Sequence, residues 1–236
     1  MKSEREAESP GLTRRNRYQK WYFEDKYGYR QKRQAIERFY GNLLSWAESE
    51  TNVNVFDGSE KLALDVGCAY GFVVDLLSKF GYRAFGVDIS DYALTEGKNL
   101  GVQNMIQSDA SHLPFGDSSF DLVTCFEVLE HLYDPERALC AISALTKHGG
   151  TFVMTTPKLG PVAQILTYLV AETHSGHPSM KQPEYWIKRL EKAGFGKMRS
   201  QTFSLLPVPP TIFNRYFTVD CRASLASHVR LVAQKD

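Results

Sequence analysis

The stretch LALDVGCAYG, from Leu62 to Gly71, decides the fold. Apolar and small residues lead into Asp65, a turn-forming stretch contains Gly67, Ala69 and Gly71, and the apolar run FVVDLL follows. This order predicts a buried strand, a tight loop and the start of a helix. In an open α/β sheet, a loop at the carboxyl end of the first strand is where a nucleotide-like ligand binds.

The spacing within this loop indicates which kind of nucleotide binds. A dinucleotide fingerprint reads G-x-G-x-x-G, whereas this loop reads D-x-G-x-A-x-G. A pyrophosphate would not favour the carboxylate of Asp65 beside it, so the loop favours a cationic group such as the ammonium of an amino acid. Gly67 permits close backbone approach, and the loop amides with the following helix N-terminus favour an anionic ligand group.

Further strand ends carry polar residues in the same order. RAFGVDIS ends in Asp88, 23 residues after Asp65, and an acidic residue about 20 residues past such a loop is placed to accept ribose hydroxyls. MIQSDASHLPF carries Asp109, and SSFDLVTCFEVLEHL and GGTFVMTTP follow. Taken singly, Asp88 also fits a helix cap and Asp109 a turn. Their joint order favours one ligand site.

This order of motifs resembles that of class I S-adenosylmethionine-dependent methyltransferases of the small-molecule type, over about Lys61 to Gly196. The resemblance implies a Rossmann-like, doubly wound α/β sheet of seven strands, mostly parallel with one antiparallel strand, plus an N-terminal helical and aromatic extension. It implies S-adenosyl-L-methionine as cofactor and S-adenosyl-L-homocysteine as product. Ala69 departs from the family's middle glycine.

The resemblance also assigns cofactor contacts. The Asp65 loop would wrap the methionine part, Asp88 would accept the ribose hydroxyls, Ile89 would pack on the adenine and Asp109 would take its amino group. An aromatic face near a sulfonium would add cation–π attraction. The expected cofactor-binding residues are Asp65, Val66, Gly67, Cys68, Ala69, Gly71, Asp88, Ile89, Asp109, Ala110, Phe126, Tyr18 and Tyr22.

The chain divides into an N-terminal arm and helix over 1–50 and a cofactor-binding domain over 51–236. The aromatic segment 18–30 and the segment 158–182 are candidate lids over the substrate; for the first, simple packing on the sheet fits equally well. Alternating periodicity predicts a parallel sheet covered on both faces. Strands are expected near 61–66, 83–88, 103–107, 120–125, 150–156, 197–205 and 228–234, and helices near 31–48, 71–80, 91–100, 126–131, 135–146, 162–171 and 183–193.

Three residues are candidates for a base or for substrate orientation. His177 is the preferred base, from a similar segment in related enzymes, and His131 and Glu127 follow the fourth strand. Each also has a purely structural explanation. His177 could anchor its loop through a hydrogen bond, His131 could lie at a helix C-terminus, where the helix dipole favours a positive charge, and Glu127 could lie in the first turn of a helix, where the dipole favours a negative one. An alcohol or carbon acceptor benefits from such a base, whereas a neutral amine does not need one.

Composition limits the remaining functions. The 236 residues carry a net charge of +1, and the N-terminus has no apolar run of the kind that a signal peptide needs. The four cysteines include no C-x-x-C pair, so a zinc site is not expected, and no other metal is predicted. Cys68, Cys125 and Cys140 are expected at buried positions. Unpaired cysteines of this kind are typical of a protein in the reducing cytoplasm.

The acceptor class stays open between several alternatives. A small molecule is favoured, with the protein a monomer or homodimer and without a membrane span. RNA is the second candidate, because a basic stretch interleaved with aromatics runs through 14–33. A protein acceptor and a non-catalytic cofactor-binding module remain alternatives. An NAD-dependent oxidoreductase is disfavoured by Asp65.

Overall fold

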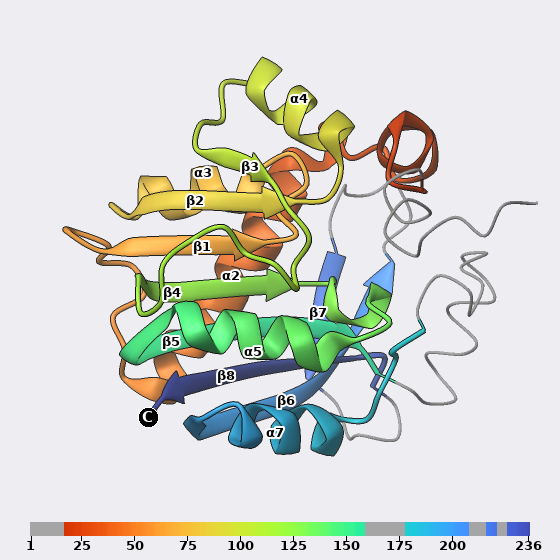
Figure 1. Ribbon diagram of the computed structural model, residues 1–236. Coiled ribbons are helices and arrows are strands. Elements are labelled where there is room, and N and C mark those ends of the chain that lie inside the picture. The colour runs from red at the N-terminus through yellow and green to blue at the C-terminus, as the bar shows by residue number, and fades with distance from the viewer. Residues whose placement is uncertain (1–16, 159–177, 208–215, 221–225) are drawn as a thin grey trace, which may run out of the picture.

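A single mixed sheet forms the centre of the computed structural model, which describes residues 17–158, 178–207, 216–220 and 226–236 (Figure 1). Its strand order is β3-β2-β1-β4-β5-β8-β6-β7. The first five strands run parallel: β1 (Leu62–Val66), β2 (Arg83–Asp88), β3 (Met105–Gln107), β4 (Phe120–Phe126) and β5 (Thr146–Pro157). All their carboxyl ends therefore meet at one edge of the sheet.

The other strands bring the last part of the chain back into this sheet. They are β6 (Phe195–Pro207), β7 (Tyr216–Asp220) and β8 (His228–Lys235). β8 lies between β5 and β6 and is antiparallel to both. The expected arrangement of seven strands with one antiparallel member is therefore confirmed. β7 adds an eighth strand, antiparallel to β6, in a segment where no strand was expected from the sequence.

Helices cover both faces of the sheet (Figure 1). On one face, α2 (Arg33–Thr51), α3 (Phe72–Lys79) and α4 (Asp91–Asn99) bury residues such as Leu44, Val74 and Leu94 against β1, β2 and β4. On the other, α5 (Pro135–Leu145) and α7 (Pro183–Lys192) bury Ile142 and Trp186. Apolar cover on both sides explains why the parallel strands read as nearly continuous apolar runs.

Local signals in the sequence account for the helix boundaries. Ser90 accepts a hydrogen bond from the Ala93 amide at 3.0 Å and caps α4. Asp134 caps α5 in the same way at 3.1 Å, with a proline in the first position. The described residues also form three short helical turns: η1 (Trp21–Lys26), η2 (Arg30–Lys32) and η3 (Leu129–His131).

Two expectations about local structure are wrong. The helix expected over 126–131 is only the single turn η3, because β4 extends to Phe126 and Glu127 then adopts a left-handed backbone with φ 55°. Cys140 is exposed, not buried, because its neighbours Ala138, Leu139 and Ile142 form the inward face of α5. The helix expected over 162–171 lies outside the described residues.

No helix in the part of the chain that the structure describes has the length and apolar character needed to span a membrane.

Candidate functional site

A cavity of about 180 Å³ lies at the carboxyl edge of β1, β2 and β4. On another side it is lined by the aromatic segment 18–30, called the N-terminal segment below. It gathers residues from sequence positions 18 to 132. The lining includes these residues singled out from the sequence: Tyr18, Tyr22, Val66, Gly67, Ala69, Asp88, Ile89, Asp109, Ala110, Phe126, Glu127 and His131. Four strand-end motifs, those of β1, β2, β3 and β4, therefore face one space.

The loop after β1 is held against its neighbours through its backbone. The amides of Gly67 and Cys68 both donate to the Val87 carbonyl, at 2.8 and 2.9 Å. Gly67 has φ 79°, and a Cβ built on it would lie 2.2 Å from a methyl carbon of Val128. Ala69 also has a positive φ, 48°. The loop thus approaches the β4–η3 corner more closely than a side chain at Gly67 would permit.

Asp88 joins the loop after β1 to the end of β2. Its Oδ2 accepts from the Ala69 amide and its Oδ1 from the Ser90 amide, both at 2.8 Å. Burial raises the pKa of the Asp88 carboxyl, and these backbone bonds oppose that rise. A carboxylate oxygen has more than one acceptor position, so Asp88 can take ligand hydroxyls while it holds the loop.

Asp65, Cys68 and Gly71 do not line the cavity but lie behind it. The Asp65 side chain is almost fully buried and accepts a hydrogen bond from the Thr124 hydroxyl at 2.7 Å. Burial, with a smaller effect of the nearby Asp88 charge, raises the pKa of Asp65 to about 7. Cys68 packs against Gly86, and Gly71 begins α3 against Met105. These residues shape the loop from beneath.

Asp109 and Ala110 follow β3 and line a further part of the cavity wall. Oδ1 of Asp109 accepts from the amide and the hydroxyl of Ser111, at 2.8 and 2.6 Å. The turn that Asp109 stabilises is the structural alternative raised from the sequence. The same residue therefore stabilises a turn and faces the cavity.

Aromatic side chains from the N-terminal segment and α2 form another wall. Tyr40 stacks on Phe126 with ring centroids 4.5 Å apart, and Tyr18 meets Tyr22 edge-on at 4.9 Å. Burial raises the pKa of Tyr18 to about 12 and that of Tyr40 well above its usual value. Tyr29 and Tyr40 also line the cavity. From the sequence, Tyr29 was only part of the candidate lid 18–30 and Tyr40 only part of the helix near 31–48, so neither was among the expected cofactor-binding residues.

Polar contacts fix the N-terminal segment over the cavity. The Ser90 hydroxyl donates to the Tyr18 carbonyl, and the Tyr70 hydroxyl donates to Glu24 at 2.6 Å. Gln19 donates to Asp91 at 3.3 Å. The segment is thus attached to the loop after β2 and to the loop after β1.

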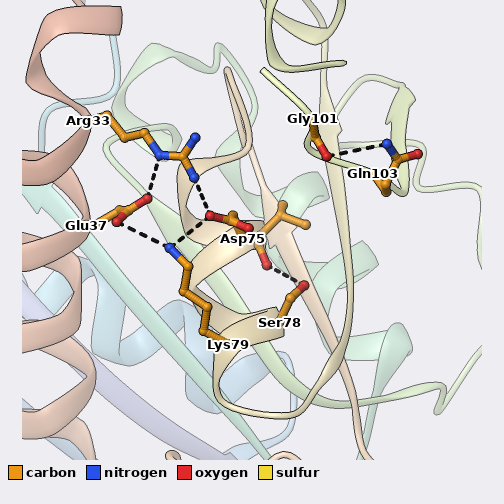
Figure 2. A network of polar contacts seen from close by, with 8 residues as sticks. Arg33, Glu37, Asp75, Ser78, Lys79, Gly101 and Gln103 are labelled. Atoms are coloured by element: carbon orange, nitrogen blue, oxygen red, sulfur yellow. Dashed lines mark hydrogen bonds and ion pairs between the residues drawn. The ribbon is translucent and has the colours of Figure 1, made fainter. Parts of the chain in front are cut away.

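An ion-pair network continues this attachment between α2 and α3 (Figure 2). Arg33 pairs with Asp75 and, at 2.7 Å, with Glu37. Lys79 pairs with Asp75 at 2.9 Å and with Glu37 at 3.5 Å. The two helices are therefore joined by alternating charges on the side chains that face each other.

Two carboxylate–histidine pairs lie where β4 ends. Glu130 lies 3.7 Å from Nε2 of His131, and its Oε2 accepts from the Thr156 hydroxyl at 3.1 Å. Burial, followed by the charge of Glu127, raises the pKa of Glu130 well above its usual value. Oε2 of Glu127 lies 3.5 Å from Nε2 of His228.

His228 was missed by sequence reasoning. The available signal was its place as the first residue of the last strand, because an antiparallel strand begins at the edge where parallel strands end.

The preferred base from the sequence, His177, lies outside the described residues, as does most of the candidate lid over 158–182. Within the described ranges, no three His, Cys, Asp or Glu side chains are grouped so that they could hold a metal ion. The expectation that the protein uses no metal stays a prediction.

Comparison with known sequences gives matches over the same motifs. Residues 64–154 match the family described as "Methyltransferase domain". Ubiquinone biosynthesis O-methyltransferase from Coxiella burnetii (strain Dugway 5J108-111) is 34% identical over 117 residues, which are 48% of this chain and 50% of that enzyme. The enzyme of the same name from Aeromonas salmonicida is 32% identical over 121 residues. The chain thus spans about half the length of the curated relatives it matches.

Solved structures match a larger part of the chain at lower identity. Magnesium protoporphyrin IX methyltransferase from Synechocystis PCC 6803, solved with bound SAH, has a TM-score of 0.66 at 16% identity and covers 95% of this chain and 99% of its own. A SAM-dependent methyltransferase from Archaeoglobus fulgidus has a TM-score of 0.65 at 21% identity, and the match covers 91% of this chain and 100% of that chain. The chain has the fold of class I S-adenosylmethionine-dependent methyltransferases, and its residues 64–154 match the family described as a methyltransferase domain.

Proposed function

We propose that this chain is an enzyme that transfers the methyl group of S-adenosyl-L-methionine to a small-molecule acceptor by in-line displacement. The observation that carries this proposal is the convergence of the Gly67 loop, Asp88 and Asp109 on one cavity. The names of the matched relatives, O-methyltransferases, favour oxygen as the acceptor atom over nitrogen or carbon.

The residues present fit such a cofactor. The carboxylate of Asp88 faces the cavity and suits a vicinal diol, and the close approach at Gly67 leaves space that a Cβ would fill. Asp65 lies behind the cavity wall, so we propose that it supports the Gly67 loop from behind and that its negative charge contributes to the attraction of the ligand's ammonium group. Ile89, Asp109 and Ala110 would hold the adenine.

The cofactor would supply a methyl group activated by the sulfonium. The chain's own residues would orient the two reactants and exclude water, which together provide much of the acceleration in a displacement. The aromatic wall of Tyr18, Tyr22 and Tyr40 would supply faces for cation–π attraction. Glu127, His131 and His177 remain the proposed groups for proton transfer or substrate orientation.

The aromatic N-terminal segment 18–30 is proposed as a lid over the acceptor. Its carbonyl at Tyr18 is bonded to Ser90, while Tyr18 and Tyr22 face the cavity. An RNA acceptor is less favoured, because Arg30 and Arg33 of the basic stretch are already paired with Glu96 and Asp75. We further propose that the protein acts in the cytoplasm without a metal, as a monomer or homodimer.

The test is transfer of radiolabelled methyl from S-adenosyl-L-methionine to three acceptor sets: hydroxylated aromatics, their amine counterparts and total RNA. The proposal predicts label in the hydroxylated small molecules and loss of this transfer in Asp88→Ala. Label only in RNA would replace the small-molecule assignment. No transfer to any acceptor, with S-adenosyl-L-homocysteine still bound, would favour the non-catalytic binding module.

A further inference from the structure

Two tyrosines reach the cavity wall from outside the sheet. Tyr29 directly precedes η2, Tyr40 lies in α2, and both line the cavity. Tyr29 stacks on Phe72 with ring centroids 5.3 Å apart and meets Tyr70 edge-on at 5.1 Å. Tyr40 stacks on Phe126 at 4.5 Å. Each ring is therefore fixed by its neighbours before a ligand arrives, which lowers the entropic cost of binding.

The hydroxyl groups of these tyrosines have no protein partner in the part of the chain that the structure describes. No hydrogen bond joins either hydroxyl to another described residue. Both phenols lie deep in the fold, and this burial raises the pKa of each. Neither oxygen, however, is among the described side-chain atoms that are both fully buried and without a partner, so the space that each oxygen meets is the cavity. A buried hydroxyl without a hydrogen bond costs free energy, and a ligand that bonds to it removes that cost.

The charges around these hydroxyls indicate which ligand group they suit. The pKa of Tyr29 is raised by burial first, and then by the charges of Asp65 and Asp88. The pKa of Tyr40 is likewise raised by burial first, and Asp65 is among the further causes. A phenol oxygen can accept a hydrogen bond. Close to carboxylates it suits an ammonium group, which they attract, better than it suits another carboxylate, which they repel.

The position of Asp65 explains why a second group is needed to contact a cationic ligand. Its side chain is almost fully buried and is not among the residues that line the cavity. Its charge can therefore attract a ligand in the cavity, but its oxygens do not form the wall that the ligand meets. Tyr29 and Tyr40 do line that wall, and Asp65 acts on both.

We propose that the hydroxyl oxygens of Tyr29 and Tyr40 bind the ammonium group in the amino-acid part of the cofactor. This rests on the methyltransferase function proposed above. An ammonium group carries three N–H donors, so two phenol oxygens can share it. The direct contact with the ammonium then comes from residues outside the sheet, and Asp65 supplies negative charge from behind.

Packing alone is the alternative role for these tyrosines, and it differs from ligand binding in what it requires. Packing requires the aromatic rings, which phenylalanine keeps. Ammonium binding requires the hydroxyl oxygens, which phenylalanine lacks. Replacement of each tyrosine by phenylalanine therefore separates the two roles while the stacks on Phe72 and Phe126 remain possible.

The test compares the unmodified full chain with Tyr29→Phe, Tyr40→Phe and the control Tyr82→Phe. Tyr82 is a buried tyrosine that packs in the core and does not line the cavity. Calorimetry uses three ligands that share the adenosine and the thioether. S-adenosyl-L-homocysteine carries both the ammonium and the carboxylate, its decarboxylated form carries the ammonium alone, and methylthioadenosine carries neither.

We expect Tyr29→Phe and Tyr40→Phe each to weaken the binding of both ligands that carry the ammonium by about 10-fold or more, the usual effect of losing a hydrogen bond to a charged group. The affinity for methylthioadenosine should stay unchanged, and its retained binding also shows that the variant is folded. Tyr82→Phe should leave the affinity for all three ligands unchanged.

The other outcomes overturn this inference in distinguishable ways. A loss confined to S-adenosyl-L-homocysteine would show that the hydroxyls bind the carboxylate. An equal loss with all three ligands would show that they support the adenosine site or the fold, and unchanged affinities in both variants would leave them as packing residues. Failure of the unmodified protein to bind any of the three ligands would instead refute the proposed function, and this inference with it.

Discussion

Gly67 offers the sharpest test of how the backbone builds the site. Replacing Gly67 by alanine adds a Cβ in a backbone with φ 79°, and that atom would lie 2.2 Å from Cγ2 of Val128. A left-handed conformation costs a residue with a side chain about 1–2 kcal/mol. Forcing an extra carbon into packed surroundings costs about 1–3 kcal/mol more. We therefore expect Gly67→Ala to lower the unfolding free energy by about 2–5 kcal/mol.

The chain supplies a control for the backbone part of this cost. Gly101 has φ 89°, and a Cβ built there meets nothing within 4 Å. Gly101→Ala should therefore show only the left-handed strain, about 1–2 kcal/mol. The additional loss in Gly67→Ala measures the clash. Val128→Ala in the Gly67→Ala background should recover part of that loss, because it removes the methyl groups that the new Cβ meets.

The assay is urea unfolding, at equal concentration, of the unmodified protein, Gly67→Ala, Gly101→Ala and the double variant Gly67→Ala/Val128→Ala. The slope of each transition is checked for constancy. Calorimetry with S-adenosyl-L-homocysteine adds a second readout, because Gly67 lines the cavity and Gly101 is not among the lining residues. If Gly67→Ala and Gly101→Ala were equally stable and bound the ligand equally well, the reasoning about close approach at this loop would be refuted.

Three further predictions concern charged residues of the site and its attachment. Asp88→Ala should weaken S-adenosyl-L-homocysteine binding by about 1–3 kcal/mol, the loss expected for a hydrogen bond to a charged group, and equal calorimetric affinities would remove Asp88 from the site. The pKa of Asp65 is raised to about 7 in the folded protein, so the folded protein without ligand binds a proton at Asp65 more readily than the unfolded chain does. The contribution of Asp65 to the free energy of unfolding should therefore fall as pH rises from about 4 to 7. Asp65→Asn should thus become progressively more stable than the unmodified protein over that interval in urea unfolding, and a constant difference would contradict the raised pKa. Asp75→Asn, which interrupts the network between α2 and α3 (Figure 2), should cost no more than about 1 kcal/mol because the pairs are partly exposed, and a loss that persisted at high salt would count against a screened surface network.

Most of the fold could be predicted because each parallel strand carries its own local signals. Buried strands such as Leu62–Val66 and Arg83–Asp88 read as short apolar runs, and Ser90 and Pro135 mark helix starts. β7 could not be predicted in this way, because its pairing with β6 is set by tertiary contact. Glu127 shows a related limit, since a left-handed residue that separates β4 from η3 has no glycine to signal it.

The residues of the candidate site that lie at strand ends could likewise be predicted from the sequence. The residues that reach the site through contacts between distant segments could not. Asp88 and Asp109 follow strands whose ends must meet at one edge. Tyr29 reaches the cavity because it packs on Tyr70 of the loop after β1, and Tyr40 reaches it because α2 places it against Phe126 of β4. His228 approaches Glu127 only because β8 inserts beside β5. Such contacts depend on the register of distant segments, which no local pattern specifies.

The most direct test of the central claim is isothermal titration calorimetry of the unmodified protein with S-adenosyl-L-homocysteine, with NAD as the control ligand. We expect one-to-one binding of S-adenosyl-L-homocysteine with a dissociation constant of about 1 μM, or about −8 kcal/mol, and no heat of binding with NAD. Binding of NAD, or of neither ligand, would contradict the assignment of the cavity to S-adenosyl-L-methionine.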